Sequence, residues 1–319
     1  MKLLITGSDG FSGSHYCRQA CDDGHQVLST DVKNEFMPDG CQIEELDIRD
    51  EGACKNICST FKPDAIIHTA RAPGNLWQIE QNRMATYQIN VLGTKNLARC
   101  AEDLGAAFVF LSTDWVFSGD KAVGQKYDEE DEGGPLNYYG VTKWVAEQEV
   151  KKLTTKWLII RPAHIYGVHA AVLDPKTKDK IGLLERSVWA GIWNAIQKGK
   201  KVRAPDTMYQ TPVHVRHLVE TTMHLLEKEM TGIYHLADRD CASRYQIAKT
   251  VLEGIGLGGE WVEKGVTEDF ARMQNLPQEL QGILPTNTCL NVNKIEKDLG
   301  VRMLTFEEGV ARLRAELTS

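Results

Sequence analysis

Residues 2–13 read KLLITGSDGFSG, and this stretch decides the fold. A short apolar run leads into three glycines spaced Gly7-x-x-Gly10-x-x-Gly13, and a longer amphipathic stretch follows. In a strand–turn–helix unit, the first glycine permits the tight turn, the second lets a pyrophosphate approach the backbone, and the third allows close helix packing. Free amides at the helix start then bind the anion. We therefore predict a dinucleotide site, rather than a glycine-rich turn without ligand, lined by Gly7, Asp9, Gly10, Phe11, Ser12 and Gly13.

Two acidic positions further along fit the rest of a dinucleotide. Asp31 closes the second predicted strand, 18 residues after Gly13, where a carboxylate accepts hydrogen bonds from the adenosine ribose. A carboxylate there repels a 2′-phosphate and favours NAD over NADP, although Lys33 works in the opposite direction. Asp47-Ile48, at the end of the third predicted strand, is placed to meet the adenine ring; the alternative for the aspartate is a helix cap.

Short apolar runs alternate with amphipathic stretches through the first half of the chain, which predicts βαβ units. Right-handed crossovers wind such units into one doubly wound parallel sheet, so the predicted fold class is α/β of the Rossmann type. The predicted strands are Lys2 to Thr6, Gln26 to Thr30, Ile43 to Asp47, Ala65 to Thr69, Ala107 to Ser112 and Trp157 to Arg161. The predicted helices are Phe11 to Asp22, Asp50 to Phe61, Gln81 to Leu104 and Tyr139 to Lys152.

The regular alternation stops after Arg161-Pro162. The segments that follow are a lysine-bearing loop (Lys176, Lys178, Lys180), a helix from about Leu183 to Lys198, a strand Pro212 to Val215, a helix through Leu226 and a strand Gly232 to Ala237. The last three indicate a return to the sheet. We therefore predict an NAD(P)-binding domain of residues 1–166 and about 205–240, and a smaller substrate-binding α/β subdomain of about 167–204 and 241–319.

The composition is that of a soluble globular protein. The 319 residues carry 37 basic and 44 acidic side chains, a net charge of −7, which argues against a nucleic-acid or anionic-membrane surface. No apolar stretch reaches the length of a membrane span or a signal-peptide core, so we expect a cytoplasmic protein. Its eight cysteines are then expected to be reduced and buried. No metal site is expected, because no His or Cys has zinc-finger spacing.

Three residues form a candidate catalytic group. Tyr139 and Lys143 are four apart at the start of a predicted helix and so share one helical face. A phenol has an ordinary pKa of about 10, and a nearby ammonium lowers that pKa because it stabilises the phenolate. Thr113 follows the fifth predicted strand, at the sheet edge where open α/β folds bind ligands, and its hydroxyl can bind the oxygen that Tyr139 protonates. The alternatives are an ordinary surface pair and strand-end turn chemistry.

These motifs stand in an order that resembles a known group of enzymes. The matching text is Thr6-Gly7-x-x-Gly10-x-x-Gly13, Asp47-Ile48-Arg49-Asp50, Lys62-Pro63-Asp64, Asn90-Val91-x-Gly93-Thr94, Ser112-Thr113-Asp114-Trp115-Val116-Phe117, Pro135-Leu136-Asn137-x-Tyr139-Gly140-x-x-Lys143, Arg161-Pro162, Tyr166-Gly167 and Leu284-Pro285-x-Asn287-Thr288. The chain resembles an extended short-chain dehydrogenase/reductase, nearly end to end. Within that superfamily it is most similar to the dTDP-4-dehydrorhamnose reductase family.

The resemblance implies an oxidoreductase that uses NAD or NADP to transfer a hydride to a carbonyl, C4 of a nucleotide-linked 4-keto-6-deoxysugar. It implies Thr113, Tyr139 and Lys143 as the catalytic triad, with Asn90 supporting a proton relay. Superfamily members commonly dimerise through two helices, so a homodimer is expected. Further cofactor contacts are implied at Thr69, Ala70, Arg71, Tyr139, Lys143 and Pro162.

Two residues depart from the superfamily's pattern. Arg71 stands where small residues are usual, and either contacts a phosphate or substrate acid or points to solvent. His164 stands where such reductases often carry a larger apolar or aromatic residue, and either selects the substrate or packs in the core.

Related functions differ at few positions. The superfamily's 4,6-dehydratases need an Asp-Glu pair after the threonine, and this chain reads Thr113-Asp114-Trp115, so dehydration is not expected. A nucleotide-sugar epimerase with tightly bound NAD would use the same triad. A non-catalytic dinucleotide-binding regulatory subunit, as in methionine adenosyltransferase, would share the fold.

The substrate end is less clearly marked. Trp189 and Trp193 are four apart on one predicted helix and either stack on a base or pack in the core. The segment 209–212, Tyr-Gln-Thr-Pro, lacks an arginine that nucleotide-sugar members often carry there. A diphosphate would then be bound by Lys201, Arg203 and Arg216 or by the lysine-bearing loop.

Overall fold

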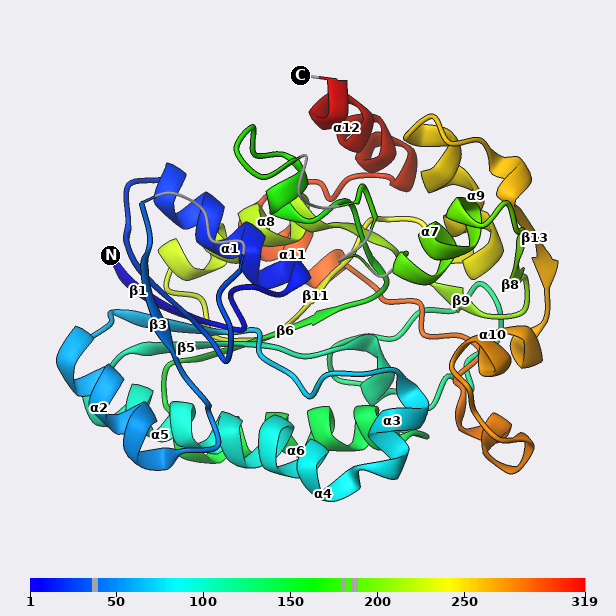
Figure 1. Ribbon diagram of the computed structural model, residues 1–319. Coiled ribbons are helices and arrows are strands. Elements are labelled where there is room, and N and C mark those ends of the chain that lie inside the picture. Colours follow the sequence, from blue (N-terminus) through cyan, green and yellow to red (C-terminus); the bar gives the residue numbers. More distant parts are fainter. Residues whose placement is uncertain (36–39, 179–181, 185–186, 188, 319) are drawn as a thin grey trace.

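A seven-stranded parallel sheet runs through the centre of the computed structural model (Figure 1), which describes residues 1–35, 40–178, 182–184, 187 and 189–318. Its strand order is β11-β6-β5-β4-β1-β2-β3. The strands are β1 (Lys2–Thr6), β2 (Gln26–Asp31), β3 (Gln42–Glu45), β4 (Ala65–His68), β5 (Ala107–Leu111), β6 (Trp157–Pro162) and β11 (Gly232–Leu236). The order reverses direction at β1, as in a doubly wound sheet, so the predicted Rossmann-type fold is confirmed.

Helices cover both faces of the sheet (Figure 1). On one face lie α2 (Glu51–Phe61), α5 (Thr94–Leu104) and α6 (Tyr138–Leu153), and on the other α1 (Phe11–Asp22), α8 (Val215–Glu227) and α11 (Asn293–Leu299). Successive side chains of one strand point to opposite faces of the sheet and so pack in the two helical layers alternately. Leu3 and Ile5 pack in the cluster with α1 and α8, and Leu4 packs in the cluster with α2 and α5. Within the described ranges, no helix combines the length and apolar sequence needed to cross a membrane.

The predicted helix from Gln81 to Leu104 is in fact divided. It comprises α3 (Leu76–Gln81), α4 (Arg83–Tyr87), a π-helical turn η1 (Gln88–Gly93) and then α5. The wide turn brings Gly93 close to the segment between β3 and α2, and a Cβ on Gly93 would lie 2.6 Å from the Ile48 side chain. The sequence-based prediction missed the division because apolar spacing does not reveal one extra residue in a turn. Such turns occur frequently at functional sites.

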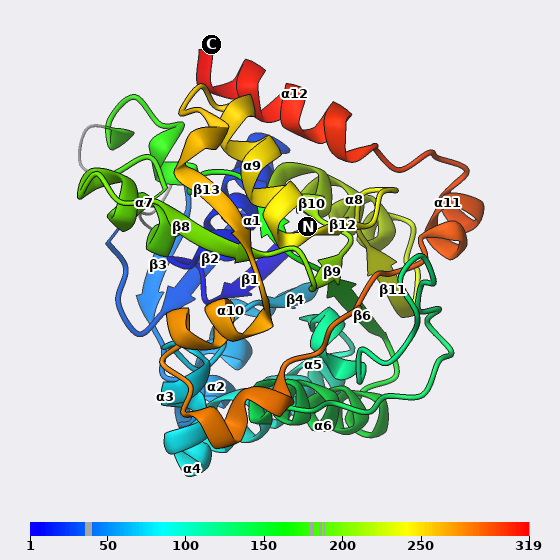
Figure 2. The same ribbon diagram turned by 90° about the vertical axis from the view of Figure 1, so that its right-hand side faces the viewer.

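A smaller group of elements lies at one end of the sheet (Figure 2). It includes α7 (Ala190–Gln197), α9 (Arg244–Gly254), α10 (Thr267–Met273), α12 (Phe306–Thr318) and the 3₁₀ turns η3 (Ala170–Val172), η5 (Gly259–Trp261) and η6 (Gln278–Ile283). Short strands pair as β8 (Val202–Pro205) with β13 (Val262–Gly265), β9 (Tyr209–Gln210) with β12 (Ala242–Ser243), and β10 (Val213–His214) with β7 (Ile165–Tyr166). One apolar cluster joins these segments and includes Leu184, Ile192, Val251 and Leu313.

Two predicted elements in this region are shorter than expected. The predicted helix from Leu183 to Lys198 is helical at Ala190–Gln197, and part of it, like Lys180 of the lysine-bearing loop, lies outside the described residues. The predicted strand from Pro212 to Val215 is reduced to β10, because Val215 already begins α8. The expectation that it returns to the central sheet was wrong, since β10 pairs with β7 instead.

The cysteines correct one prediction. Cys241 and Cys289 form a disulfide across a sequence separation of 48, with their Cα atoms 5.7 Å apart. The other six cysteines are free, and Cys21 and Cys41 are partly exposed rather than buried. The prediction of eight reduced thiols was therefore wrong for one pair, because counting cysteines in a sequence does not show which two the fold brings together.

Candidate active site

The glycine loop joins β1 to α1 and leaves no room for side chains. Gly7 has a φ of 71°, which L side chains rarely adopt, and a Cβ there would lie 2.5 Å from the Ala70 nitrogen. A Cβ on Gly13 would lie 2.0 Å from the Gly7 carbonyl oxygen. Gly10 is the N-cap of α1, and no side chain caps the helix there. The loop therefore fits a pyrophosphate held by backbone amides at the helix start.

Asp31 ends β2 beside this loop. Its Oδ2 accepts a hydrogen bond from the Asp9 nitrogen at 3.1 Å, and its Oδ1 accepts one from the Val32 nitrogen at 2.7 Å. The carboxylate thus holds the loop in place and stays partly exposed. Asp9 and Ser12 are buried in the loop, whereas Phe11 is partly exposed.

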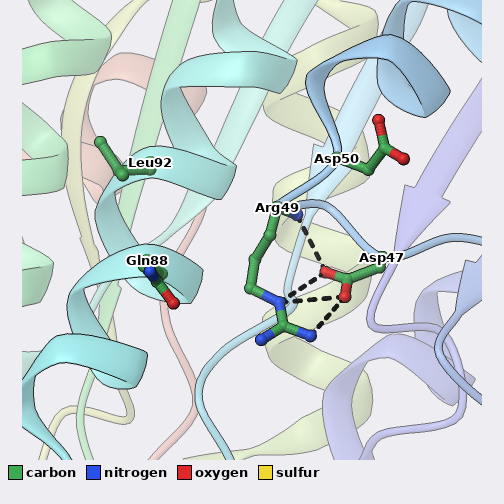
Figure 3. Close-up of a pocket in the computed structure, with 5 residues that line it drawn as sticks. All are labelled: Asp47, Arg49, Asp50, Gln88 and Leu92. Carbon is green, nitrogen blue, oxygen red and sulfur yellow. Dashed lines mark hydrogen bonds and ion pairs between the residues drawn. The ribbon is translucent and has the colours of Figure 1, made fainter.

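A pocket of about 400 Å³ lies near the end of the third strand (Figure 3), lined by Asp47, Arg49, Asp50, Gln88 and Leu92. Arg49 holds Asp47 with its Nε 2.9 Å from both carboxylate oxygens, and this pairing lowers the pKa of Asp47. The cap of α2 is Asp50, whose side chain accepts from the Ala53 nitrogen at 2.9 Å. The alternative of Asp47 as a helix cap was therefore wrong, and contact of Asp47-Ile48 with adenine stays a prediction.

The residues after β4 lie over the glycine loop. Thr69 Oγ1 donates to the Thr6 carbonyl at 2.8 Å, and the Ala70 backbone closes on Gly7. Arg71 is exposed and donates from Nη1 to the Ala72 carbonyl at 2.8 Å. Its charge nevertheless reaches the phenol of Tyr139. Arg71 therefore borders the catalytic group from the solvent side.

The structure brings Thr113, Tyr139 and Lys143 together at the carboxyl edge of β5. Thr113 is 7% exposed and donates to Asp114 Oδ1 at 3.1 Å. Asn137 caps α6, and the Trp115 ring stands edge-on to Tyr139 with centroids 6.3 Å apart. The helix packs directly on the turn η2 (Asp114–Val116), since a Cβ at Gly140 would lie 2.2 Å from the Trp115 carbonyl oxygen.

The charges in this group differ from the expected pattern. Burial raises the pKa of Tyr139 above its usual value, while the charge of Arg71 and the nearby Thr113 hydroxyl oppose that rise. Burial lowers the pKa of Lys143 to about 7, against the attraction of Glu147, and its Nζ lies 3.9 Å from the centroid of the Phe110 ring. The predicted lowering of the Tyr139 pKa by Lys143 is not found. At neutral pH Tyr139 is a protonated phenol, which suits a proton donor.

Asn90 is fully enclosed in the π-helical turn. Its Oδ1 accepts from the Ala72 nitrogen at 2.7 Å, and its Nδ2 donates to Thr142 Oγ1 at 2.9 Å. Thr142 Oγ1 in turn donates to the Tyr139 carbonyl at 2.9 Å. Asn90 therefore ties the loop after β4 to the catalytic helix, and its part in a proton relay stays a prediction.

A buried ion pair behind the catalytic helix was not predicted. Arg161 donates from Nε to Glu147 Oε1 at 2.9 Å and from Nη2 to Oε2 at 2.7 Å, and Ser112 Oγ also donates to Oε1 at 2.5 Å. The two charged side chains are 3% and 0% exposed. Glu147 lies one helical turn after Lys143, and that spacing is the signal that could have marked it.

The substrate side of the group contains a second polar network. Gln210 donates from Nε2 to Asp114 Oδ2 at 2.7 Å and presents Oε1 to His164 Nδ1 at 3.0 Å. Thr288 also donates to Asp114 Oδ2, at 2.5 Å. His164, beyond Pro162 at the end of β6, has a φ of 32°. Because these residues come from four distant segments, no motif in the sequence connects them.

Other predicted substrate contacts are not brought together. Lys201 pairs with Glu263 at 3.1 Å, Arg203 with Asp269 at 3.6 Å and Arg216 with Glu316 at 3.3 Å. Trp189 is 3% exposed and packs in the apolar cluster, with Trp193 partly buried against the same cluster. The structure thus favours core packing for both tryptophans. It places another cation, Arg244, against Trp115, and the sequence reading did not select that residue.

Strand order places the glycine loop and the Thr113–Tyr139–Lys143 group along one edge of the sheet. A dinucleotide that begins at the loop therefore ends beside the phenol. This arrangement is that of the extended short-chain dehydrogenase/reductases, which are NAD(P)-dependent oxidoreductases, and this chain is one of them.

Within that class the family can be named. The family model described as the RmlD substrate binding domain matches residues 1–319, so the chain belongs to this family.

Similar proteins include two reductases. A probable low-salt glycan biosynthesis reductase of Haloferax volcanii is 26% identical, over 99% of this chain and 98% of its own length. A dTDP-4-dehydrorhamnose reductase of Aggregatibacter actinomycetemcomitans is 26% identical, over 98% of both chains. The crystal structure of dTDP-4-dehydrorhamnose reductase from Bacillus anthracis in complex with NADP has a TM-score of 0.81 at 24% identity, covering 99% of both chains.

One similar protein is named as a subunit of another enzyme rather than as a reductase. The methionine adenosyltransferase 2 subunit beta of Xenopus laevis is 26% identical, over 97% of this chain and 86% of its own length. Membership of the family therefore does not by itself fix the reaction.

Proposed function

We propose that this protein is a reductase that uses NADH or NADPH to reduce a carbonyl, C4 of a nucleotide-linked 4-keto-6-deoxysugar. The observation that carries the proposal is the buried Tyr139 phenol, protonated at neutral pH, with the Thr113 hydroxyl and the Lys143 ammonium around it. The similar reductases from Aggregatibacter and Haloferax support the same direction of reaction.

Each residue has one task in this reaction. NADH or NADPH, when bound, would supply the hydride that the carbonyl carbon accepts. Tyr139 donates its phenolic proton to the carbonyl oxygen, and Thr113 orients that oxygen by a hydrogen bond. Lys143 binds the nicotinamide ribose, and its pKa of about 7 lets it exchange a proton near neutrality. The glycine loop holds the pyrophosphate and Asp31 holds the adenosine ribose, while Thr69, Ala70, Arg71 and Pro162 border the nicotinamide half.

Three further expectations belong to the proposal. The Asp31 carboxylate favours NAD over NADP, since it repels a 2′-phosphate. Residues 1–166 and about 205–240 serve the cofactor, and about 167–204 and 241–319 serve the substrate. A homodimer through the helices α5 and α6 and a cytoplasmic location stay predictions.

The test is turnover by Tyr139→Phe, with Tyr138→Phe as the matched control. Loss of the donor should lower kcat about 100-fold or more, whereas NADPH affinity should not change. Oxidation of NADH and NADPH is followed by absorbance, with nucleotide-linked and free keto-sugars as substrates. Wild-type turnover by Tyr139→Phe would show that the phenol is not the proton donor. Reaction of a free carbonyl compound alone would reject the nucleotide-linked substrate.

A second candidate function is regulatory binding. It is favoured by the alignment with the beta subunit of methionine adenosyltransferase 2, which covers 97% of this chain. Absence of turnover with every substrate, together with a stable complex with another enzyme, would favour this role. Stoichiometric NAD that stays bound through purification would instead favour an epimerase.

A further inference from the structure

Arg244 is a partly buried cation that packs against two aromatic rings. It begins α9, and its guanidinium carbon lies 4.1 Å from the centroid of the Phe270 ring and 5.9 Å from that of Trp115. Its Nε is buried and makes no hydrogen bond. In the part of the chain that the structure describes, no carboxylate forms an ion pair with this guanidinium. Removing a guanidinium from water is costly unless an anion compensates.

Asp114 is the acidic residue whose charge acts on Arg244, and its carboxylate already accepts hydrogen bonds from other residues. Asp114 influences the pKa of Arg244, but its oxygens accept hydrogen bonds from Thr113, Gln210 and Thr288. Asp114 is held by these donors and forms no ion pair with Arg244 among the described residues. The guanidinium of Arg244 is therefore available to pair with an anion from outside the chain.

Two further nitrogens near this position also lack partners. His164 Nε2 and Trp189 Nε1 are buried without hydrogen bonds, and the two rings lie 4.9 Å apart. Trp189 is 3% exposed. Strand pairing sets Gln210, the partner of His164, opposite Ala242, two residues before Arg244, so the three side chains share one region. Buried polar atoms without partners are rare, and three around one position indicate an absent polar ligand.

The hydrogen bonds of Gln210 decide the proton position on His164. Because the amide nitrogen of Gln210 donates to Asp114, its oxygen faces His164, and Nδ1 must carry the hydrogen. In the neutral ring Nε2 is then an acceptor. The missing ligand should offer an oxyanion to Arg244, an acceptor oxygen to Trp189 and a hydroxyl to His164.

We propose that Arg244 binds an oxyanion of the substrate, a carboxylate or a phosphate, and that His164 Nε2 accepts a hydrogen bond from a substrate hydroxyl. The site adjoins the catalytic group, since Trp115 touches both Arg244 and Tyr139. The inference rests on the proposed function and deepens it: the substrate is a hydroxylated anion.

The test measures binding rather than turnover. Thymidine diphosphate and glucuronate are titrated by calorimetry into the NADP⁺-loaded protein, its Arg244→Gln and Arg244→Lys variants, and the surface control Arg302→Gln. Truncating one partner of a desolvated charge pair weakens binding by about 30-fold or more, and we expect that loss in Arg244→Gln. Arg244→Lys should recover part of it, and Arg302→Gln should bind as wild type does.

The outcomes separate the two sources of the oxyanion. A loss of thymidine diphosphate binding alone identifies a phosphate, and a loss of glucuronate binding alone identifies a carboxylate. Equal affinity of wild type and Arg244→Gln for both probes, or no binding of either by wild type, would overturn the inference. Arg244-dependent binding without turnover of any keto-sugar would reject the reductase proposal and keep this one, whereas turnover with a KM unchanged in Arg244→Gln would do the reverse.

Discussion

The proposed cofactor end and the proposed substrate end of the candidate active site are built from different parts of the chain. At the cofactor end the backbone sets the shape: three glycines leave the space that a pyrophosphate would need, and Asp31 holds the loop through the Asp9 nitrogen. At the substrate end, side chains from distant segments meet, with Gln210 joining Asp114 to His164. The cofactor end depends on the space that glycines provide because they have no side chain. The substrate end depends on charge and hydrogen bonding.

This difference predicts two kinds of sensitivity. A single methyl group should disable the cofactor end, whereas the substrate end should tolerate changes in shape and respond to changes in charge. Lys143 gives the strongest test, because burial of its charge costs stability and the proposed function assigns this residue to cofactor binding.

Lys143→Met should have the largest effect, because it should raise stability and abolish turnover. The folded-state pKa of about 7 lies below the ordinary 10.5, so the folded protein binds fewer protons than the unfolded chain between these values. Wild-type stability should therefore rise as the pH increases from 7 to 10.5. At or below pH 7 the variant should be more stable by up to about 5 kcal/mol, with turnover lost. Glu147 keeps its partners Arg161 and Ser112, so no charge is orphaned.

Thermal and urea unfolding between pH 6 and 10 check this prediction. The advantage of the variant should shrink as the pH rises toward 10.5. A constant or growing difference in stability would mean that Lys143 has an ordinary lysine pKa in the folded protein. Burial of its charge would then not cost stability.

Gly13→Ala should have the next largest effect. Its Cβ would stand 2.0 Å from the Gly7 carbonyl oxygen, so the loop must move. We expect NADPH affinity to fall about 100-fold and the free energy of unfolding to fall by roughly 1–3 kcal/mol, as for overpacking. Fluorescence titration and urea unfolding measure the two quantities.

The matched control is Gly191→Ala in α7, where a Cβ meets nothing within 4 Å. This change should leave NADPH affinity intact and raise stability by up to about 1 kcal/mol, because alanine favours the helix. Equal behaviour of the two variants would contradict the idea that the cofactor end depends on empty space.

Asp31→Asn should have the smallest effect and concerns cofactor choice. The amide oxygen can still accept from the Asp9 nitrogen, but the repulsion of a 2′-phosphate is gone. We expect the ratio of NADPH to NADH affinity to rise about 10-fold, or roughly 1.4 kcal/mol. Lys33→Gln should shift the same ratio slightly the other way. An unchanged ratio in Asp31→Asn would show that the carboxylate does not meet the ribose.

The features that could be predicted from sequence were local ones. The strand Lys2–Thr6 and the helix Phe11–Asp22 are found with the predicted bounds, since apolar spacing and the three glycines act within a dozen residues. The structure also brings Thr113 and Tyr139 together, because strand order carries their motifs to one sheet edge. By contrast, the raised pKa of Tyr139 depends on burial, which spacing does not report.

The features that escaped prediction require distant segments to meet. Arg244 is recognised as a candidate site residue only because it packs against Trp115 and Phe270. The residues next to it in the sequence form no motif that would indicate this. Arg161 and Glu147 pair from a strand and a helix, and the π-helical turn around Asn90 depends on how close Gly93 comes to Ile48. Each is a property of packing rather than of a short sequence pattern.

The disulfide between Cys241 and Cys289 also determines how the chain would come apart. A protease that cuts once between these two cysteines leaves two fragments that stay covalently joined. On a denaturing gel such a nicked molecule would run as a single species until a thiol reductant is added. Thr288, which donates to Asp114, is the neighbour of Cys289 and would stay tethered to the segment that begins α9 even after the cut.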